Sequence, residues 1–299
     1  MSAQVSKLIL MAGLIIVVAV LVLTRRIWGT ALTHGLPSIW RIAKMTVAEA
    51  RRKRVLQAVV VLVILILTSL TFFTYLNPEE QARMIIDSGL TTIAAFGMLL
   101  AIFIAAFMIP HEIEARTLYP ILAKPVRRAE FLLGKYLGAL IILGVVVAIM
   151  TVVLVGVLLL QDSMVEDLAN SKFDPNLLPV LFAAAMSYCA LAVLTALIML
   201  ISSVASTTMT VIGAVLLWVV GSMQSMLLDL STKVTGATKV LTLAFFYAVP
   251  PLQNFDFRME VSNHIGVSMP AAVFALERGL LYAIVALVVA AIFFDSRQV

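Results

Sequence analysis

Apolar runs of about twenty residues, separated by charged stretches, constrain this chain more than any other feature of its sequence. Of the 299 residues, 63% are hydrophobic and only 12% are charged. A hydrocarbon layer ~30 Å thick is crossed by about 20 helical residues, and lipid offers no water to satisfy backbone amides. The runs therefore predict membrane-spanning helices, and the expected fold class is an all-α polytopic membrane protein.

Seven runs are candidates for membrane spans. The first, residues 8–24, also fits a signal peptide, but Arg25 and Arg26 follow it directly, as in a stop-transfer flank. Residues 1–35 are therefore interpreted as an N-terminal transmembrane anchor. The other six runs are assigned to one domain, 55–299, and cover 55–76, 90–109, 136–160, 177–204, 209–230 and 271–294.

The distribution of basic residues predicts the orientation of the chain. Lysines and arginines concentrate in the stretches 25–54 and 111–135, and short basic loops stay on the cytosolic side of a membrane. The stretches 77–89 and 161–176 carry few basic residues and are expected to be external loops. The sequence thus predicts a multi-pass protein of the plasma (bacterial inner) membrane, with the N-terminus outside and the C-terminus cytosolic. The net charge of +5 does not indicate nucleic acid binding, because the basic residues border spans instead of covering one globular face.

Two connecting segments have patterns of their own. The stretch 36–54 has apolar residues at helical spacing after Ser38, a suitable N-cap. It is expected to be a cytosolic amphipathic helix, with its apolar stripe in the lipid headgroups and its arginines toward anionic lipid. A solvated basic linker is the alternative. The stretch 231–270 contains only a short apolar segment, 240–250, which ends in two prolines, so it is expected to be an external re-entrant segment.

Motifs for metal or nucleotide chemistry are incomplete. His111 and Glu112 begin like a zinc-protease helix, but alanine stands where the second histidine belongs, and the three histidines are far apart. Gly134 and Lys135 resemble the end of a phosphate-binding loop, but tyrosine follows them in place of serine or threonine. No catalytic, cofactor-binding or metal-binding residue is expected, and the chain is not expected to be an enzyme by itself.

Ionisable residues inside spans often mark ion-coupled transport, and this chain has few of them. Asp229 and Glu277 are candidates for such a role, with ordinary residues at the water interface as the alternative. Met223 and Met226 share a helix face and fit a copper path, but methionine is also a common filler of apolar helices. Because the spans contain almost no ionisable residues, the sequence indicates that energy for transport comes from a partner.

The charged segment between the third and fourth runs has the features of a surface helix. Pro110 is expected to begin a short helix, with Glu112 and Glu114 favourably placed in its first turn, and Pro120 is expected to end it. Such a helix at the cytosolic face can act as a lever for a partner. An ordinary anchoring loop is the alternative.

This segment resembles a loop of ABC-2 type (type V) ABC transporter permeases, in which an acidic residue precedes Gly-Thr, then Pro-x-Ser-Arg, then Gly-Lys. Arg116 and Arg127 depart from the pattern, because glycine and serine are common at those positions. The resemblance covers residues 39–297. Within the family, the sequence is similar to a loosely defined group, the permeases of multi-copper-enzyme and nitrous-oxide-reductase maturation. The residues that fall on the pattern are Glu114, Thr117, Pro125, Arg128, Gly134 and Lys135.

The resemblance implies a six-helix permease half with one extra N-terminal helix. Such a half pairs with a second copy or a related permease and binds two ABC ATPase subunits, which hold ATP and Mg²⁺ and drive export. An ion-coupled transporter and a non-transporting membrane scaffold are the alternatives, and the bare spans favour an amphipathic or lipid-like cargo over an ion. The residues expected in the ATPase-coupling loop are Glu112, Glu114, Arg116, Thr117, Leu118, Tyr119, Arg127 and Arg128.

Small and polar residues mark one face of the second and the sixth runs. Such faces either pack helices closely or line a pathway, and both interpretations remain open. Our hypothesis places these two spans at the seam between two permease copies, with lipid around them. The residues concerned are Thr68, Thr71, Tyr75, Gly213, Gly221 and Ser225.

Overall fold

The computed structural model describes most of the chain after the predicted N-terminal anchor. The described residues are 36–52, 54–70, 78–114, 128–169, 177–233, 249–263 and 265–296, together with Thr238, Thr242 and Phe246. Within these ranges the regular secondary structure is helical and contains no strand, which confirms the all-α fold class. The anchor predicted over residues 1–35 lies outside the described residues.

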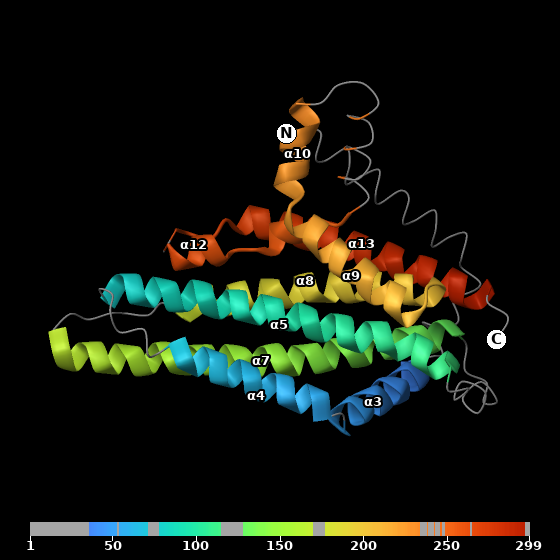
Figure 1. Ribbon diagram of the computed structural model, residues 1–299, viewed down its shortest axis with the longest axis horizontal. Coiled ribbons are helices and arrows are strands. Elements are labelled where there is room, and N and C mark those ends of the chain that lie inside the picture. Colours follow the sequence, from blue (N-terminus) through green and yellow to red (C-terminus); the bar gives the residue numbers. More distant parts are fainter. Residues whose placement is uncertain are drawn as a thin grey trace.

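Four long helices form the body of the molecule and run side by side along its long axis (Figure 1). Each contains a stretch that is long and apolar enough to cross a membrane, as expected for a polytopic membrane protein. The helices are α5 (Pro78–Glu114), α7 (Arg128–Ala169), α8 (Leu177–Val204) and α13 (Met269–Ser296).

Shorter elements cover this body. The helices α3 (Leu36–Arg52) and α4 (Arg54–Ser69) pack on α7, and α9 (Thr207–Ser222) packs on α5 and α8. After α9, the chain turns into α10, which projects from the bundle (Figure 1). The remaining elements are α10 (Gln224–Lys233), the 3-10 helix η2 (Leu252–Phe255) and α12 (Arg258–Ser262).

The bundle has two ends, which we name the α3 end and the α12 end. At the α3 end, α5 finishes, α7 begins and α13 finishes, whereas α5, α8 and α13 all begin at the α12 end (Figure 1). Aromatic pairs close the packing at both ends. Phe131 stacks on Phe294 at the α3 end with ring centroids 6.0 Å apart, and Phe182 meets Phe257 edge-on at 5.6 Å at the α12 end.

Close helix contacts in the core depend on small residues, as expected where lipid provides no hydrophobic force between helices. A Cβ atom on Gly89 of α5 would lie 2.3 Å from the Cδ1 atom of Leu154 in α7. A Cβ atom on Gly97 would lie 2.5 Å from the Cδ1 atom of Leu191 in α8. Leucines on α7 and α8 therefore fill grooves that the glycines leave open on α5.

Two tyrosines connect α7 and α8 across the core. The hydroxyl of Tyr136 donates a hydrogen bond to the carbonyl of Ala192 at 3.2 Å, and the hydroxyl of Tyr188 donates to the carbonyl of Leu140 at 3.1 Å. Each helix thus supplies one tyrosine to the other. Because the helices are antiparallel, this exchange fixes how far one is shifted along the other.

Three helix boundaries differ from the predictions. The stretches 77–89 and 161–176 are not simple external loops, because α5 begins at Pro78 and α7 continues to Ala169. The prediction that Pro110 begins a separate helix is also wrong, since α5 runs through it to Glu114. Polar residues end an apolar run without ending a helix, and hydropathy alone does not detect such extensions.

The predicted continuous span 209–230 is interrupted at Met223. The backbone N–H of Met223 donates to the carbonyl of Val220 at 3.2 Å, three residues back, which tightens the last turn of α9. The side chain of Gln224 then donates to the backbone carbonyl of Phe246 at 3.0 Å and is almost fully buried. The buried amide holds the chain in the new direction that α10 follows.

Candidate functional site

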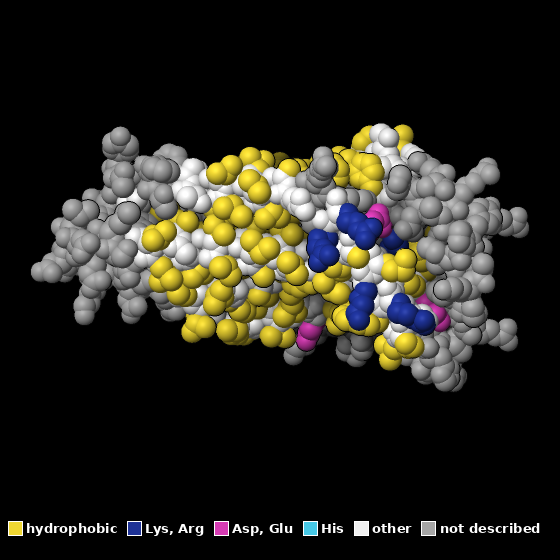
Figure 2. Space-filling model, turned by 90° about the horizontal axis from the view of Figure 1, so that it is seen from below, with side chains coloured by type: hydrophobic (Ala, Val, Ile, Leu, Met, Phe, Trp, Pro, Cys, Tyr) yellow, Lys and Arg dark blue, Asp and Glu magenta, His cyan; other side chains and the backbone are white. Residues whose placement is uncertain are grey.

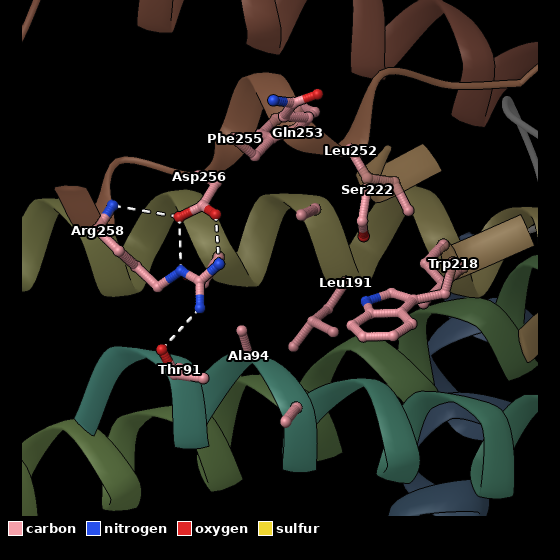
Figure 3. A pocket seen from close by; sticks show the side chains of 14 residues that line it. Thr91, Ala94, Leu191, Trp218, Ser222, Leu252, Gln253, Phe255, Asp256 and Arg258 are labelled. Carbon is pink, nitrogen blue, oxygen red and sulfur yellow. Dashed lines mark hydrogen bonds and ion pairs between the residues drawn. The ribbon is translucent and has the colours of Figure 1, made fainter. Parts of the chain in front are cut away.

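A pocket of about 270 Å³ lies between α5, α8, α9 and η2 (Figure 3). Its floor is made by side chains of α5 and α8, while α9 and the segment 252–258 enclose it from other sides. The residues that line it are Thr91, Ala94, Ala95, Ser187, Ala190, Leu191, Leu194, Trp218, Ser222, Leu252, Gln253, Phe255, Asp256 and Arg258.

One side of the pocket carries an ion pair that is tied to α5. The Nε atom of Arg258 donates to the Oδ1 atom of Asp256 at 2.7 Å, and its Nη2 atom donates to Oδ2 of the same carboxylate. The Nη1 atom of Arg258 donates to the hydroxyl of Thr91 at 2.7 Å, and that hydroxyl donates to the carbonyl of Asp87. This chain of hydrogen bonds fastens the start of α12 to α5 (Figure 3).

The Asp256 carboxylate makes the stability of this connection depend on pH. Burial by itself would raise the pKa of Asp256, but the hydrogen bonds and positive charge of Arg258 outweigh the effect of burial and lower the pKa below its ordinary value.

The ion pair therefore contributes stability above the unfolded-state pKa of about 3.9, and this contribution is lost as the pH falls through the folded-state pKa of Asp256. We expect Asp256→Asn to lower the thermal midpoint at neutral pH, and the gap to wild type to narrow as the pH falls below about 3.9. A gap that stays equal from neutral to acid pH would contradict this assignment.

The rest of the pocket is mainly apolar. Ala94 and Leu191 line it from α5 and α8, and Trp218 and Ser222 face it from α9 (Figure 3). The small alanine side chain leaves space between two tightly packed helices. With charged and polar groups at one side and apolar groups at the other, the pocket has the lining expected for an amphipathic molecule.

Two glycines allow η2 to pack closely against α9 and α13. A Cβ atom on Gly279 of α13 would lie 2.5 Å from the Cζ atom of Phe255. A Cβ atom on Gly221 of α9 would lie 2.9 Å from the Cδ1 atom of Leu252 and 3.1 Å from the carbonyl of Pro250. The wall of the pocket that η2 forms therefore depends on both glycines.

The predicted seam residues have different environments. Gly221 is buried within the chain, and Gly213 faces Ile201 of α8, from which a Cβ atom would be 3.3 Å away. Ser225 is exposed, and its backbone N–H donates to Oε1 of Gln253 in η2 at 3.0 Å. Thr68 is exposed on α4, while Thr71 and Tyr75 lie outside the described residues.

The predicted coupling residues lie at the α3 end as far as they are described. Glu112 and Glu114 form the last turn of α5, and Arg128 begins α7. The structure thus brings the two borders of the predicted loop to one end of the bundle. Arg116, Thr117, Leu118, Tyr119 and Arg127 lie outside the described residues.

The helix α3 is docked beside this border. Its buried residues Ile42 and Thr46 fit against Gly134 and Gly138 of α7, where a Cβ atom on either glycine would lie 2.6 Å from the partner's Cβ. The prediction that the apolar stripe of α3 enters the headgroups is therefore wrong, because α7 covers it. The Gly-x-x-x-Gly spacing signals such a contact, but sequence reasoning overlooked it.

A buried lysine reinforces the contact between α3 and α7. The Nζ atom of Lys135 lies 3.8 Å from the carboxylate of Glu49 on α3, and 5.7 Å from the ring centroid of Phe131. The side chain of Lys135 is 6% exposed and that of Glu49 is 50% exposed, so a buried lysine meets a carboxylate that remains partly in solvent. Gly134 and Lys135, two residues of the family pattern, thus both hold α3 in place.

The candidates for ion or metal transport do not come together. Asp229 lies exposed on α10 and Glu277 lies exposed on α13. Met223 and Met226 are about half exposed at the bend after α9. Across the described residues, no group of three or more histidine, cysteine, aspartate or glutamate side chains is placed to hold a metal ion.

Comparison with known proteins decides the family of the chain. The family described as "ABC-2 family transporter protein" matches residues 40–299, which include most of α3 and every later described helix. This chain belongs to the ABC-2 transporter family. The resemblance inferred from the charged segment is thereby confirmed at the level of the family.

A curated relative supports the same assignment over part of the ABC-2 protein. It is a probable ABC transporter permease protein, NosY, from Pseudomonas aeruginosa, and is 30% identical over 122 residues. The match covers 40% of this chain and 43% of the relative, so it spans less than half of either protein. It supports the loose grouping of the ABC-2 protein with permeases of the NosY kind.

Proposed function

We propose that this ABC-2 permease exports an amphipathic, lipid-like cargo, driven by two separate ABC ATPase subunits that bind at the α3 end. The observation that carries the proposal is the extension of α5 beyond its apolar stretch. The apolar run ends at Ile109, whereas the helix continues to Glu114, about 7.5 Å further at 1.5 Å per residue. A rigid helix end thus carries the connection to α7 out of the hydrocarbon layer.

Exposed basic residues support a cytosolic position for the α3 end. Arg41, Lys44, Arg51 and Arg52 all lie exposed on α3. Lys and Arg side chains gather beside the hydrophobic surface in Figure 2. Basic segments beside spans remain in the cytosol. The α5–α7 connection is then accessible to cytosolic ATPases, the C-terminus is cytosolic and the N-terminus is outside.

The placement of ionisable residues supports an external source of energy. Asp229 and Glu277 lie on exposed faces, which gives no support to a proton or ion path through the bundle. In the proposed mechanism, closure of two ATP-bound subunits moves the end of α5 and changes access to a cavity between two permease halves. ATP and Mg²⁺ remain on the ATPase subunits.

The pocket supports the proposed class of cargo. Its ion pair of Asp256 and Arg258 suits a polar group, while Leu191 and Leu194 suit an acyl chain or another apolar portion. The segment 231–270, of which η2 is part, is proposed to be re-entrant from the external side. Export would then deliver the polar group of the cargo toward the ion pair.

A second permease copy, or a related permease, is proposed to cover α4, α5 and α9. The helices α4 and α9 both contact α5, and exposed Phe103 stacks on exposed Phe107 along α5 at 5.2 Å. Thr68 and Ser225 are the seam candidates that remain exposed. Because Gly221 packs on Leu252 within the chain, its role is proposed to be intramolecular packing.

Reversing the charges at the end of α5 tests the coupling assignment. We expect Glu112→Lys with Glu114→Lys to abolish co-purification of an ABC ATPase, because like charges replace attractive ones at the proposed contact. Purification in mild detergent, followed by identification of bound proteins and an ATPase assay, measures this loss. Wild-type amounts of ATPase on the double variant would exclude these residues from the contact.

The matched control carries the same reversal at the other end of the same helix. Glu79→Lys with Glu80→Lys changes two acids at the start of α5, near the α12 end. This variant is expected to retain the ATPase at wild-type levels when equal amounts of permease are compared. Loss of the ATPase from both variants would indicate a general folding defect and would not support a coupling role for Glu112 and Glu114.

A further inference from the structure

The docking of α3 on α7 determines where its charged face points. Ile39, Ile42, Ala43 and Thr46 are buried against α7, so the opposite side of the helix faces away from the bundle. At 100° per residue, this opposite side carries the four exposed basic residues of α3. They are Arg41, Lys44, Arg51 and Arg52.

The basic face lies on the side of the molecule, at the border of its apolar surface. The contact of α3 with α7 centres on Gly134 and Gly138, at the start of the apolar run 136–160. Figure 2 shows Lys and Arg side chains directly beside the hydrophobic surface and facing the same way. At this level, a side chain that points sideways meets lipid headgroups.

Large apolar side chains flank the basic face on both sides. Leu36 and Trp40 lie along one border and Met45 along the other, and all three are more than half exposed. The Nζ atom of Lys44 lies over the ring of Trp40, 5.4 Å from its centroid. Apolar residues with tryptophan beside cations are typical of helices that lie in the membrane interface.

The charge of this face is positive and not neutralised within the described ranges. The exposed acid of α3, Glu49, points to Lys135 of α7. Arg41 donates to the backbone carbonyl of Pro37 and to the hydroxyl of Ser38, and both acceptors are uncharged. In the part of the chain that the structure describes, no ion pair joins an acid to the four cations.

We propose that the outer face of α3 binds the phosphate groups of anionic phospholipids in the surrounding leaflet. Arginine and lysine supply donors and charge for headgroup phosphates, while Trp40, Leu36 and Met45 enter the upper acyl region. The bound lipid joins the outer side of α3 to the membrane, while the inner side remains on α7. This site is separate from the pocket and does not depend on the proposed ATPase coupling.

The test measures lipid preference of the full-length protein purified in detergent together with any subunits that co-purify. Phosphatidylglycerol or phosphatidylcholine is added, and bound lipid is counted by native mass spectrometry alongside the thermal midpoint. Wild type is expected to prefer phosphatidylglycerol by about tenfold or more. The variant with Arg41, Lys44, Arg51 and Arg52 all changed to glutamine is expected to lose this preference, and 0.5 M salt is expected to reduce it in wild type.

A charge-matched pair of variants locates the effect. Arg51→Gln with Arg52→Gln should lose part of the preference, whereas Arg83→Gln with Lys233→Gln, which removes two exposed cations elsewhere, should keep it. Equal binding of both lipids by wild type, or an undiminished preference in the four-residue variant, would overturn the proposal. The proposal would also be overturned if inorganic phosphate raised the thermal midpoint of the wild-type protein as much as phosphatidylglycerol does. The same holds if the four-residue variant lost a co-purifying protein but kept its lipid preference.

Discussion

Replacing Gly134 and Gly138 of α7 by leucine is expected to displace α3 and to destabilise the protein by about 3 kcal/mol, near the upper end of measured overpacking costs. A Cβ atom at Gly134 already comes within 2.9 Å of the backbone carbonyl of Ile39. Since backbone atoms and Cβ atoms cannot rotate away, the whole of α3 must move. Thermal unfolding in detergent measures the loss, and limited trypsin digestion after Arg51 and Arg52 reports the release of α3.

Gly156 of the same helix supplies the control for this experiment. Apart from its neighbours in the chain and the backbone of α7 itself, no described atom lies within 4 Å of a Cβ atom built at Gly156, so Gly156→Leu meets open space. Because leucine is also a better helix former than glycine, we expect this variant to be as stable as wild type or slightly more stable. If the Gly134 and Gly138 variants unfolded at the wild-type midpoint and resisted trypsin equally, the close contact between α3 and α7 would be disproved.

Truncating Phe255 to alanine is the second change with a large expected effect. Its side chain is 1% exposed and fills the space between η2 and Gly279 of α13. Removing a buried aromatic ring costs about 3–5 kcal/mol in well-packed proteins, through lost contacts and the cavity that remains. We expect a lowered thermal midpoint and faster hydrogen exchange over 249–263, because η2 loses its anchor.

The same truncation at an exposed phenylalanine separates packing from a general effect of losing a ring. Phe293 of α13 is 46% exposed, and Phe293→Ala is expected to change stability by less than about 1 kcal/mol. A similar loss of stability in both variants would show that burial beside Gly279 is not what makes Phe255 important. Faster exchange confined to 249–263 is expected for Phe255→Ala alone.

Hydropathy predicted the helical class because each long helix contains a stretch in which nearly all residues are apolar. It did not predict where α5 begins and ends, because Glu80, Asp87 and Glu114 belong to this helix but lie outside its apolar run. It also missed the end of α7, which continues past its apolar run to Ala169. A helix stays hydrogen-bonded within itself in water as well as in lipid, so a change of solvent need not end it. The bend at Met223 was missed because apolar residues continue on both sides of it.

The pocket was not predicted because its parts are distant in sequence and ordinary in type. Asp256 and Arg258 are separated by one residue, but Thr91, which binds the arginine, lies 167 positions away from it. Trp218 and Ser222 are ordinary members of an apolar helix until the bend brings η2 beside them. By contrast, the charged segment indicated the family, because it depends on the local order of a few residues.

The short length of α9 has a consequence for the bilayer around the permease. Its 16 residues rise only about 24 Å before the chain turns away at Met223, compared with a hydrocarbon thickness of ~30 Å. Its side chains Met209, Ile212 and Leu216 are exposed, so lipid or a second subunit must adjust to this length. A span that is too short is accommodated by local thinning of the bilayer. Lipid headgroups beside α9 are then drawn toward the level of Trp218 and the pocket, which would shorten the distance that the proposed lipid-like cargo has to travel.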